Sequence, residues 1–429
     1  LDLPVTMEFM GNDLLVVQKN DGKVRLIREN ILQNQPVLDV EVSNYGEVGL
    51  LGITSRDSTV YLFFQEAFHD GGLMLESRIY SYTWNGQKLI EPKLVKTLPG
   101  WSEGGAGHYS GVFTTDLSKN VYFVIGNQYK FGTLQNYLPS ESFNCNIKAV
   151  VCDSSQNVSF SDSIEYTISC INVSFHHYTT NPFSYQTQQP DLSDNPWETN
   201  LSFILQNIQS CFKGFIYNNF SNGNWKDTSV ILKIVPNDDD YYAIGVRNSF
   251  GLTVDPLTGN LWMTDNGNDK YDEINLVLEK SNLGATKYVG PVNKESVATV
   301  PGYEEYVYKN PEFSWELPVG VTSLEFVDSN MFKKYKNWLF VADSHNGNIY
   351  KFKLNSDRTG FVFNSSHLED NIVNILSKPA GITEDTDFTR IDYSTFLVEP
   401  MDEILFGKNF GIISDITFGP DGSLYVISF

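Results

Sequence analysis

Short apolar runs alternate with short polar turns along most of the chain, and one arrangement of the two recurs. It consists of an apolar strand, a turn rich in Asp, Asn or Gly, and a second apolar strand. The second strands are rich in Val, Tyr, Phe and Leu, which favour strands, and no amphipathic helical period runs through them. The pattern predicts six β-hairpins, which begin at Thr6, Leu51, Gly111, Gly251, Val321 and Ile413.

A single hairpin cannot bury both of its faces, so repeated hairpins have to pack around a common axis to form a core. The copies start between about 45 and about 140 residues apart. A solenoid does not tolerate such uneven spacing, whereas a propeller does, because additional residues leave the blades as loops. We therefore expect an all-β, six-bladed β-propeller formed by residues 1–129 and 236–429, with two β-sandwich domains as the alternative.

Residues 130–235 form the widest gap between copies, and their composition differs from that of the flanking segments. All four cysteines lie there, together with four of the five Asn-x-Ser glycosylation sequons. The sequence predicts a glycosylated, disulfide-containing insertion and a secreted or cell-surface protein. Four cysteines allow three pairings, and nothing in the sequence selects one; a zinc site is disfavoured because no Cys-x-x-Cys pair exists. The cysteines are Cys145, Cys152, Cys170 and Cys211, and the sequons are at Asn157, Asn172, Asn200, Asn219 and Asn364.

The charge balance narrows the classes of partner. Lys and Arg number 30 against 52 Asp and Glu, giving a net charge of -22. Nucleic-acid binding is not expected, because neutralising phosphates requires a basic surface. No run of 18 apolar residues exists, so no transmembrane segment is expected. The chain begins at Leu1, which is consistent with a removed signal peptide or with a fragment boundary.

Three segments carry residues suited to a site. His108 lies among glycines in residues 104–111, where it could act as a general base. Arg247 and Asn248 precede a predicted strand in residues 245–251, and they offer a guanidinium fork and an amide. Residues 264–277, around Gly267, are rich in the oxygen ligands that calcium prefers. Each segment taken alone also fits an ordinary structural turn.

Six segments, in order along nearly the whole chain outside the insertion, resemble the soluble quinoprotein glucose or aldose sugar dehydrogenases (the glucose/sorbosone dehydrogenase family). They are residues 14–27 (LLVVQKNDGKVRLI), 47–53 (EVGLLGI), 107–111 (GHYSG), 245–267 (GVRNSFGLTVDPLTGNLWMTDNG), 272–277 (DEINLV) and 419–426 (GPDGSLYV). The resemblance implies a six-bladed propeller that carries pyrroloquinoline quinone (PQQ) and calcium. It also implies a small sugar substrate and a separate electron acceptor.

The resemblance assigns roles to individual residues. His108 matches the catalytic base, and Arg247 with Asn248 matches the pair that contacts the quinone in catalysis. Further matched positions are Glu47 and Tyr109 on the substrate side, Gly267 and Asn268 at the calcium, and His345 and Lys408 near the cofactor. The calcium would polarise a quinone carbonyl.

Four departures from the family pattern weaken the expected cofactor site. Tyr109 is bulky where a small polar residue is usual, and Asn127 replaces an Asp. Residues 281–287 have lost the usual Asn-Tyr-Gly-Trp-Pro motif, and residues 412–415 read Ile-Ile-Ser-Asp where many members have Arg-x-Arg-Asp. Fewer cations weaken the binding of a tricarboxylate. The last hairpin also ends at Phe429, so we expect its blade to be completed by the N-terminal strand or by another chain.

Two classes of function follow from these patterns. The first is an extracellular oxidoreductase that oxidises an aldose or related sugar with PQQ and calcium. The second is a catalytically inactive, sugar-dehydrogenase-like propeller that acts as a cell-surface binding or structural protein, through its insertion or its open last blade. Other propeller hydrolases or lactonases form a smaller third class.

Overall fold

The structure is a computed structural model that describes residues 1–100, 107–130, 132–137, 226–234, 241–377 and 396–429, with the backbone alone at 145–148 and 165–168. All elements discussed below except β12 and β13 lie in one compact unit comprising residues 1–129, 134–136 and 225–429. The sequons at Asn157, Asn172, Asn200 and Asn219 lie outside the described residues, as do Cys152, Cys170 and Cys211, and only the backbone is described at Cys145. The predicted insertion and its disulfides therefore stay predictions.

All six predicted hairpins are present, and each pairs antiparallel. The described residues contain no α-helix, only strands and short 3₁₀ turns. None of the described helical turns is long and apolar enough to cross a membrane. The hairpins are β1 (Pro4–Met10) with β2 (Asp13–Gln18), β6 (Leu50–Arg56) with β7 (Thr59–Glu66), β10 (Val112–Thr115) with β11 (Val121–Ile125), β16 (Gly251–Val254) with β17 (Leu261–Asp265), β22 (Val321–Phe326) with β23 (Leu339–Asp343), and β29 (Ile413–Phe418) with β30 (Leu424–Ser428).

Five of the hairpins are extended into larger sheets by strands that the repeat pattern did not predict. The first sheet adds β3 (Lys23–Arg28), β4 (Ile31–Leu32) and β5 (Leu38–Asp39), and the second adds β8 (Glu76–Trp84) and β9 (Leu89–Leu98). The third adds β14 (Val230–Ile234), β15 (Tyr241–Ile244), β19 (Ser281–Asn282) and β20 (Val307–Tyr308). The fourth adds β18 (Asp272–Val277), β21 (Phe313–Trp315) and β25 (Ile372–Val373), and the fifth adds β24 (Ile349–Phe352) and β28 (Leu405–Gly407). Two further pairs form two-stranded sheets of their own, β12 (Cys145–Lys148) with β13 (Glu165–Ile168) and β26 (Ile375–Ser377) with β27 (Leu397–Val398).

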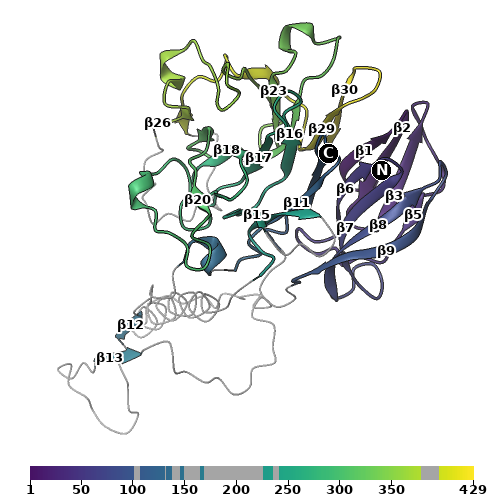
Figure 1. Cartoon of the computed structure of the whole chain (residues 1–429), viewed down its shortest axis with the longest axis horizontal. Helices are drawn as coiled ribbons and strands as arrows, with labels where there is room; N and C mark the ends of the chain where they lie inside the picture. Colours follow the sequence, from purple (N-terminus) through teal and green to yellow (C-terminus); the bar gives the residue numbers. More distant parts are fainter. Residues whose placement is uncertain are drawn as a thin grey trace, which may run out of the picture. The chain divides into compact units, whose positions relative to one another are not determined.

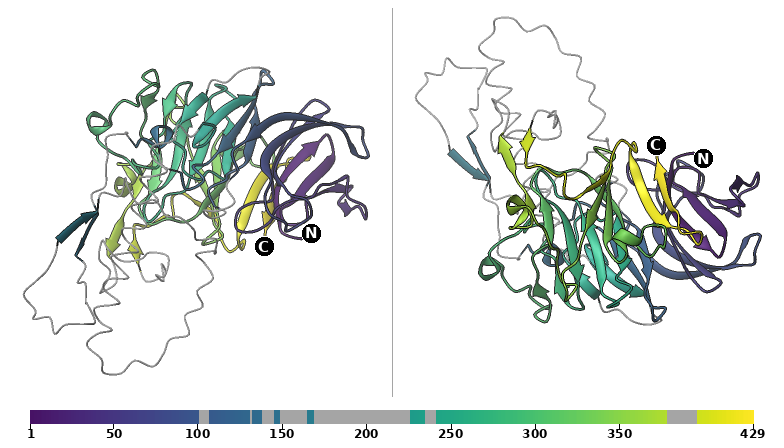
Figure 2. Two further views of the ribbon diagram at one scale, coloured as in Figure 1. Left: turned by 90° about the horizontal axis from the view of Figure 1, so that it is seen from below. Right: turned by 90° about the horizontal axis from the view of Figure 1, so that it is seen from above.

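The first strand of each hairpin, called the inner strand below, contacts the inner strands of the neighbouring sheets. β1 contacts β6, and the contacts continue through β10, β16, β22 and β29 back to β1. The N-terminal strand and the C-terminal hairpin therefore lie side by side (Figures 1 and 2). The sheets bury large apolar side chains between them, such as Trp262, Trp315 and Phe352 in one cluster. This is an all-β, propeller-like arrangement.

The last hairpin differs from the other five, because β30 pairs only with β29 among the described strands. β11, β17 and β23 are fully buried, whereas four of the five residues of β30 are partly or fully exposed. The N-terminal sheet supports this hairpin, since Ile427 packs in a cluster with Met7 and Val16. The rings of Phe9 and Tyr425 also meet edge to face, with their centroids 5.1 Å apart. The N-terminal sheet thus packs against the last hairpin, but among the described strands it adds no hydrogen-bonded strand to that hairpin.

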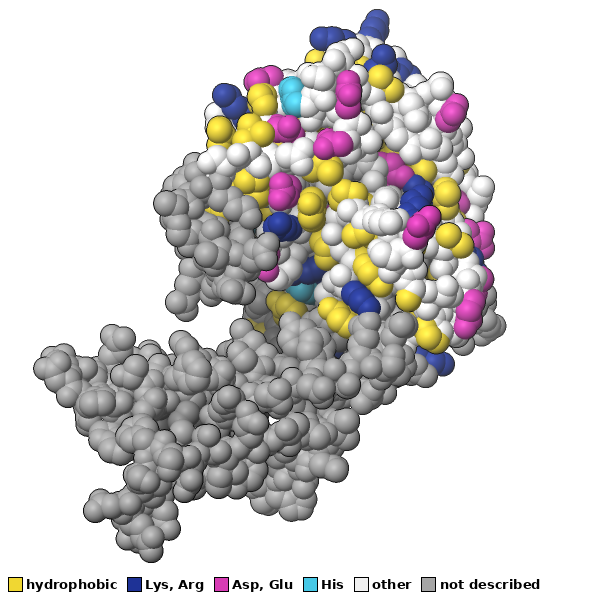
Figure 3. Space-filling model, turned by 90° about the vertical axis from the view of Figure 1, so that its left-hand side faces the viewer, with side chains coloured by type: hydrophobic (Ala, Val, Ile, Leu, Met, Phe, Trp, Pro, Cys, Tyr) yellow, Lys and Arg dark blue, Asp and Glu magenta, His cyan; other side chains and the backbone are white. Residues whose placement is uncertain are grey.

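Charged side chains are mixed over the face drawn in Figure 3. Among the described residues on this face, Lys and Arg are scattered between Asp and Glu rather than forming one continuous field. An acidic chain with such a surface offers no platform for phosphates on this side.

Candidate active site

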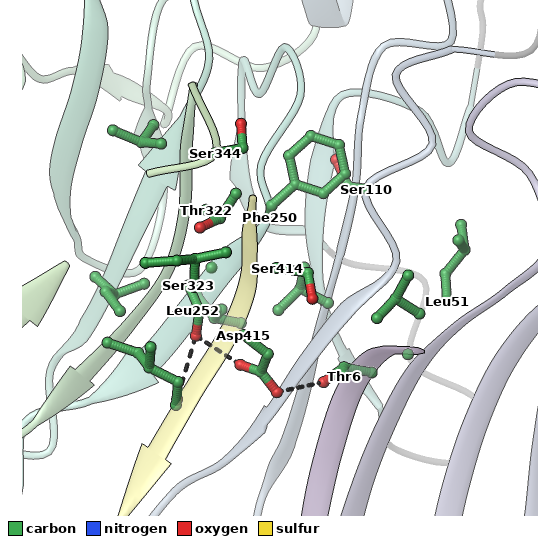
Figure 4. Close-up of a pocket in the computed structure, with 18 of the residues that line it drawn as sticks. Thr6, Leu51, Ser110, Phe250, Leu252, Thr322, Ser323, Ser344, Ser414 and Asp415 are labelled. Carbon is green, nitrogen blue, oxygen red and sulfur yellow. Dashed lines mark hydrogen bonds between the residues drawn. The ribbon is translucent and has the colours of Figure 1, made fainter. Parts of the chain in front are cut away.

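A cavity of about 890 Å³ runs between the inner strands, and it collects most of the residues that the sequence singled out. Side chains from several sheets line it, among them Thr6, Ser110, Phe250, Thr322 and Ser344 (Figure 4). The predicted site residues that border it are Glu47, His108, Arg247, Asn248, Gly267, Asn268 and His345. The fold thus brings residues from five separate parts of the sequence to the wall of one cavity.

His108 is held in one tautomer by its neighbours. It lies in the loop before β10 with a positive φ of 62°, and it is only 6% exposed. The distance between its Nδ1 and Asn127 Oδ1 is 2.7 Å, and the backbone N–H of Tyr129 donates to the same Oδ1. Because that atom accepts from a backbone amide, it is the oxygen, so His108 Nδ1 carries the proton. Nε2 is then the nitrogen with the lone pair.

The surroundings of His108 also fix its charge. Burial lowers the pKa of the imidazole to about 3, with a further lowering by the nearby Arg247 guanidinium. The hydrogen bond to Asn127 acts in the opposite direction but is the smallest of the three effects. The ring is therefore neutral at pH 7, which is the form that accepts a proton.

Glu47 joins two parts of the site. Its carboxylate accepts the backbone N–H of His108 at 2.5 Å and the amide Nδ2 of Asn248 at 3.3 Å. Burial raises the pKa of Glu47, and these hydrogen bonds oppose the increase because they favour the ionised form. The carboxylate thereby ties the loop of His108 to the loop between β15 and β16.

The Arg247–Asn248 pair is positioned by Asp265, at the end of β17. The two carboxylate oxygens of Asp265 accept the backbone N–H groups of Arg247 at 2.8 Å and of Asn248 at 2.6 Å. Burial raises the pKa of Asp265 to about 6. Asn248 Oδ1 is buried and has no hydrogen-bond partner, although Asn248 borders the cavity. This acceptor needs a donor, and a ligand in the cavity would supply one.

The oxygen-rich turn at residues 266–268 is occupied by Arg247. The guanidinium donates to Asn266 O at 2.7 Å, to Gly267 O at 2.8 Å and to Asn268 Oδ1 at 3.1 Å. The turn is tight, because a Cβ added at Gly267 would lie 1.9 Å from Lys270 O. Within the described residues, no cluster of three or more His, Cys, Asp or Glu side chains is arranged to hold a metal ion.

Tyr109 and Lys408 do not border the cavity. Tyr109 is fully buried in a cluster with Val48 and Met74, so its bulk does not fill the space a ligand would take. Lys408 is exposed on the loop after β28. At the position of the missing arginines, Ile412 does border the cavity. The assigned roles of Tyr109 and Lys408 thus have no support in this geometry.

Lys19 and Thr322 also line the cavity, although no feature of the sequence singled them out as site residues. Lys19 Nζ donates to Asn20 Oδ1 and to Asn44 O, and burial lowers its pKa. The buried hydroxyl of Thr322 has no partner. A lysine after a strand and a threonine within one are too common to be recognised as site residues.

Three carboxyl groups form a second polar zone of the same cavity, where the inner strands run past one another. They belong to Glu8 on β1, Glu325 on β22 and Asp415 on β29. Asp415 accepts from the hydroxyls of Thr6 at 3.0 Å and Ser323 at 2.7 Å (Figure 4). Burial is the main cause that raises the pKa values of Glu8 to about 7, Glu325 to about 8 and Asp415 to about 6. We call this zone the carboxyl channel.

Comparison with known proteins gives both sequence and structural likenesses. Residues 222–381 match the family model for glucose/sorbosone dehydrogenases. The chain is 23% identical to an aldose sugar dehydrogenase (YliI) of Escherichia coli over 121 residues, and 33% identical to an uncharacterized protein of Borreliella burgdorferi over 132 residues. Each match covers 28% of this chain and 33% or 34% of the relative. The matched part thus spans about a third of the length of these curated relatives.

Solved structures resemble the fold over its whole length. A putative glucose dehydrogenase of Thermus thermophilus covers 100% of this chain and 91% of its own, with a TM-score of 0.56 and 17% identity. A PQQ-bound aldose sugar dehydrogenase of Streptomyces coelicolor gives a TM-score of 0.56 and 15% identity, covering 100% of this chain and 88% of its own. The apo form of the soluble Escherichia coli enzyme gives 0.55 and 14%, covering 99% and 93%.

At these identities the structural likeness establishes the fold alone, and the likeness to the family rests on the sequence match over residues 222–381. Residues 222–381 contain five of the seven predicted site residues that border the cavity, namely Arg247, Asn248, Gly267, Asn268 and His345. The resemblance expected from the sequence is therefore confirmed over residues 222–381, which match the model of the glucose/sorbosone dehydrogenase family.

Proposed function

We propose that the protein is a quinoprotein-type oxidoreductase that oxidises an aldose or related sugar in the cavity between the inner strands. The observation that carries the proposal is the tautomer of His108, which leaves a lone pair on Nε2. His108 lines the same cavity as Arg247 and Asn248. A neutral imidazole beside a buried amide and a guanidinium suits the removal of a hydroxyl proton. One of the two relatives named above, from Escherichia coli, is described as an aldose sugar dehydrogenase, which agrees with this chemistry.

The proposed framework is a six-bladed propeller. Its support is the sequence of contacts between inner strands, which passes through six sheets and returns from β29 to β1. The sixth blade would consist of the β29–β30 hairpin, packed against the N-terminal sheet. A blade with two strands has a free outer edge, where an additional strand could pair.

The cavity fits PQQ in size and in some of its polar groups. A volume of about 890 Å³ lies within the range of ordinary cofactor and ligand sites, about 300–1,000 Å³. Arg247, Asn248 and His345 would hold the quinone, and the unpaired Asn248 Oδ1 would accept a hydrogen bond there. The fit to calcium is poor, because the oxygens of residues 266–268 already accept hydrogen bonds from Arg247.

When bound, PQQ would supply the two-electron acceptor that this oxidation needs for the hydride of the sugar C–H bond. The chain supplies the proton acceptor: the sugar O–H bond breaks, and its proton passes to His108 Nε2. Asn127 keeps the opposite nitrogen protonated, so the lone pair of Nε2 is available to accept that proton. Glu47 and Asn248 present acceptor oxygens at the same wall, and these match the hydroxyl donors of a sugar.

A cofactor-free binding propeller is the second candidate. The specific observation in its favour is that three donors of Arg247 are used within its own turn, while Ile412 lies where a cation was expected. A tricarboxylate would then meet few positive charges, whereas the unpaired oxygens of Asn248 and Thr322 suit a neutral hydroxylated ligand. Such a protein would act as a binding or structural component at a cell surface.

Reconstitution separates the two candidates. The full chain is incubated with PQQ, with and without calcium, and dye reduction is followed with glucose and other aldoses. Activity that is abolished by His108→Ala supports the oxidoreductase, with His69→Ala as a matched control because His69 is an exposed histidine that does not line the cavity. No quinone uptake at micromolar PQQ would refute the oxidoreductase and favour the binding propeller.

The proposed location is the cell exterior, with glycans on the sequons and disulfides among the four cysteines. Asn364 is exposed in the structure, which agrees with glycosylation there. Mass spectrometry of the secreted protein before and after glycosidase treatment tests this part. Unmodified sequons and four free thiols in protein from its native source would contradict it.

A further inference from the structure

The oxygen-rich turn at residues 266–268 has two potential occupants, a divalent cation and the Arg247 guanidinium. Calcium binds six to eight oxygens at about 2.3–2.6 Å, and backbone or amide carbonyls are suitable ligands. Two backbone carbonyls and one amide oxygen of this turn converge on a common point, and the guanidinium of Arg247 lies there.

The arrangement around Arg247 is built rather than incidental. The side chain is 8% exposed, and Asp265 fixes its backbone through the N–H group. The turn is fixed independently, because Asp272 Oδ1 accepts the N–H of Gly267 and its Oδ2 accepts the N–H groups of Val319 and Gly320. The backbone of Arg247 and the backbone of the turn are thus each held by a different buried carboxylate, Asp265 and Asp272.

The positive charge of Arg247 would repel a calcium ion at the same oxygens. A guanidinium keeps its charge in proteins, and like charges a few ångströms apart in a poorly hydrated site repel strongly. The hydrogen bonds that Arg247 donates would also be lost, which would leave buried donors without acceptors.

We infer that Arg247 takes the place of the divalent metal at this turn, so that the site presents a guanidinium to its ligand and does not bind calcium there. Three of the five guanidinium N–H donors are used by the turn, which leaves Nε–H and one Nη2–H for an oxygen of a ligand. What this means for catalysis rests on the proposed function, whereas the exclusion of calcium does not.

Thermal unfolding of the full chain in EDTA or in millimolar CaCl₂ tests the inference. We compare wild type with Arg247→Met, which keeps an unbranched side chain but removes the charge, with Asn268→Ala, and with Arg247→Met/Asn268→Ala. Wild type should show no calcium effect from this turn. Arg247→Met should unfold several degrees lower in EDTA, because three oxygens lose their donors, and calcium should restore part of the loss only while Asn268 is present.

Two results would overturn the inference. One is a calcium-dependent rise in the wild-type unfolding temperature that Asn268→Ala abolishes. The other is a calcium response that is the same in wild type and both Arg247 variants. Circular dichroism of each variant confirms the folded state before the comparison. Failure of the proposed function would appear differently, as absent PQQ uptake in every variant, and it would leave the calcium comparison intact.

Discussion

The wall around His108 and the carboxyl channel belong to the same cavity, yet they are built differently. The first is made from loops at the ends of inner strands, where buried backbone N–H groups and Arg247 hold each polar side chain in place. The second is made from the interiors of the strands, and Asp415 there accepts from the hydroxyls of Thr6 and Ser323 as well as from the backbone N–H of Met7. Burial raises the pKa of carboxyl groups in both zones, to about 6 for Asp265 and for Asp415, and the mutual repulsion of like charges adds to the increase at Glu8 and Glu325.

One cavity can thus contain a zone suited to chemistry, around His108, and a zone that affects stability, the carboxyl channel. Loops can orient a base and a guanidinium, because residues there adopt unusual backbone angles such as the positive φ of His108. Strand interiors have fixed geometry, so Glu8, Glu325 and Asp415 influence how neighbouring inner strands pack. We therefore expect changes in the wall around His108 to affect chemistry and changes in the channel to affect stability and its pH dependence.

The largest expected effect is on catalysis. In protein reconstituted with PQQ, His108→Ala should lower kcat by about 10²–10⁴-fold, which is the usual contribution of a general base. Rates measured at saturating sugar check this, alongside the unfolding temperature. A fall in rate with an unchanged unfolding temperature assigns His108 to chemistry, whereas full activity would remove the basis for the proposed role.

Asp265→Ala should destabilise the protein by about 2–4 kcal/mol, because the buried N–H groups of Arg247 and Asn248 lose their acceptor. Asp265→Asn retains one acceptor oxygen and should lose less. Urea unfolding measures both variants. Equal losses in the two would show that the acceptor role of this side chain is not what stabilises the loop.

Glu325→Gln should change how stability depends on pH. Burial raises the pKa of Glu325 to about 8 from 4.5, so the unfolded chain releases this proton first, and wild type loses stability as pH rises from about 4.5 to 8. The neutral glutamine removes that loss and should be more stable by about 1–3 kcal/mol at pH 8, with little difference near pH 4.5. Unfolding is measured across this range, with the exposed Glu369→Gln as control. A parallel offset at all pH values would contradict the prediction.

The smallest expected effect is a change in the basicity of His108. Asn127→Asp places a negative charge beside the imidazole, which should raise its pKa from about 3 by roughly one unit. Titration of the histidine ring protons by NMR measures this without any activity assay. A lowered or unchanged pKa would mean that the hydrogen bond between these two side chains does not form as described.

The sequence by itself determined the six hairpins, because strand and turn preferences act over a few residues and are visible in any local window. It also indicated His108, Arg247, Asn248 and Glu47, since each occurs in a segment similar to a known family. Both predictions depend on local information, and the structure confirms the hairpins and brings the four residues to one cavity.

Only the tertiary structure decided which groups face one another. No local pattern shows that Asn127 fixes the tautomer of His108, that Arg247 occupies the turn at 266–268, or that Tyr109 points into a core cluster. The carboxyl channel was equally hidden, because Glu8, Glu325 and Asp415 lie on three strands far apart in sequence. Burial and like-charge contacts, which set their protonation, arise only when the inner strands pack together.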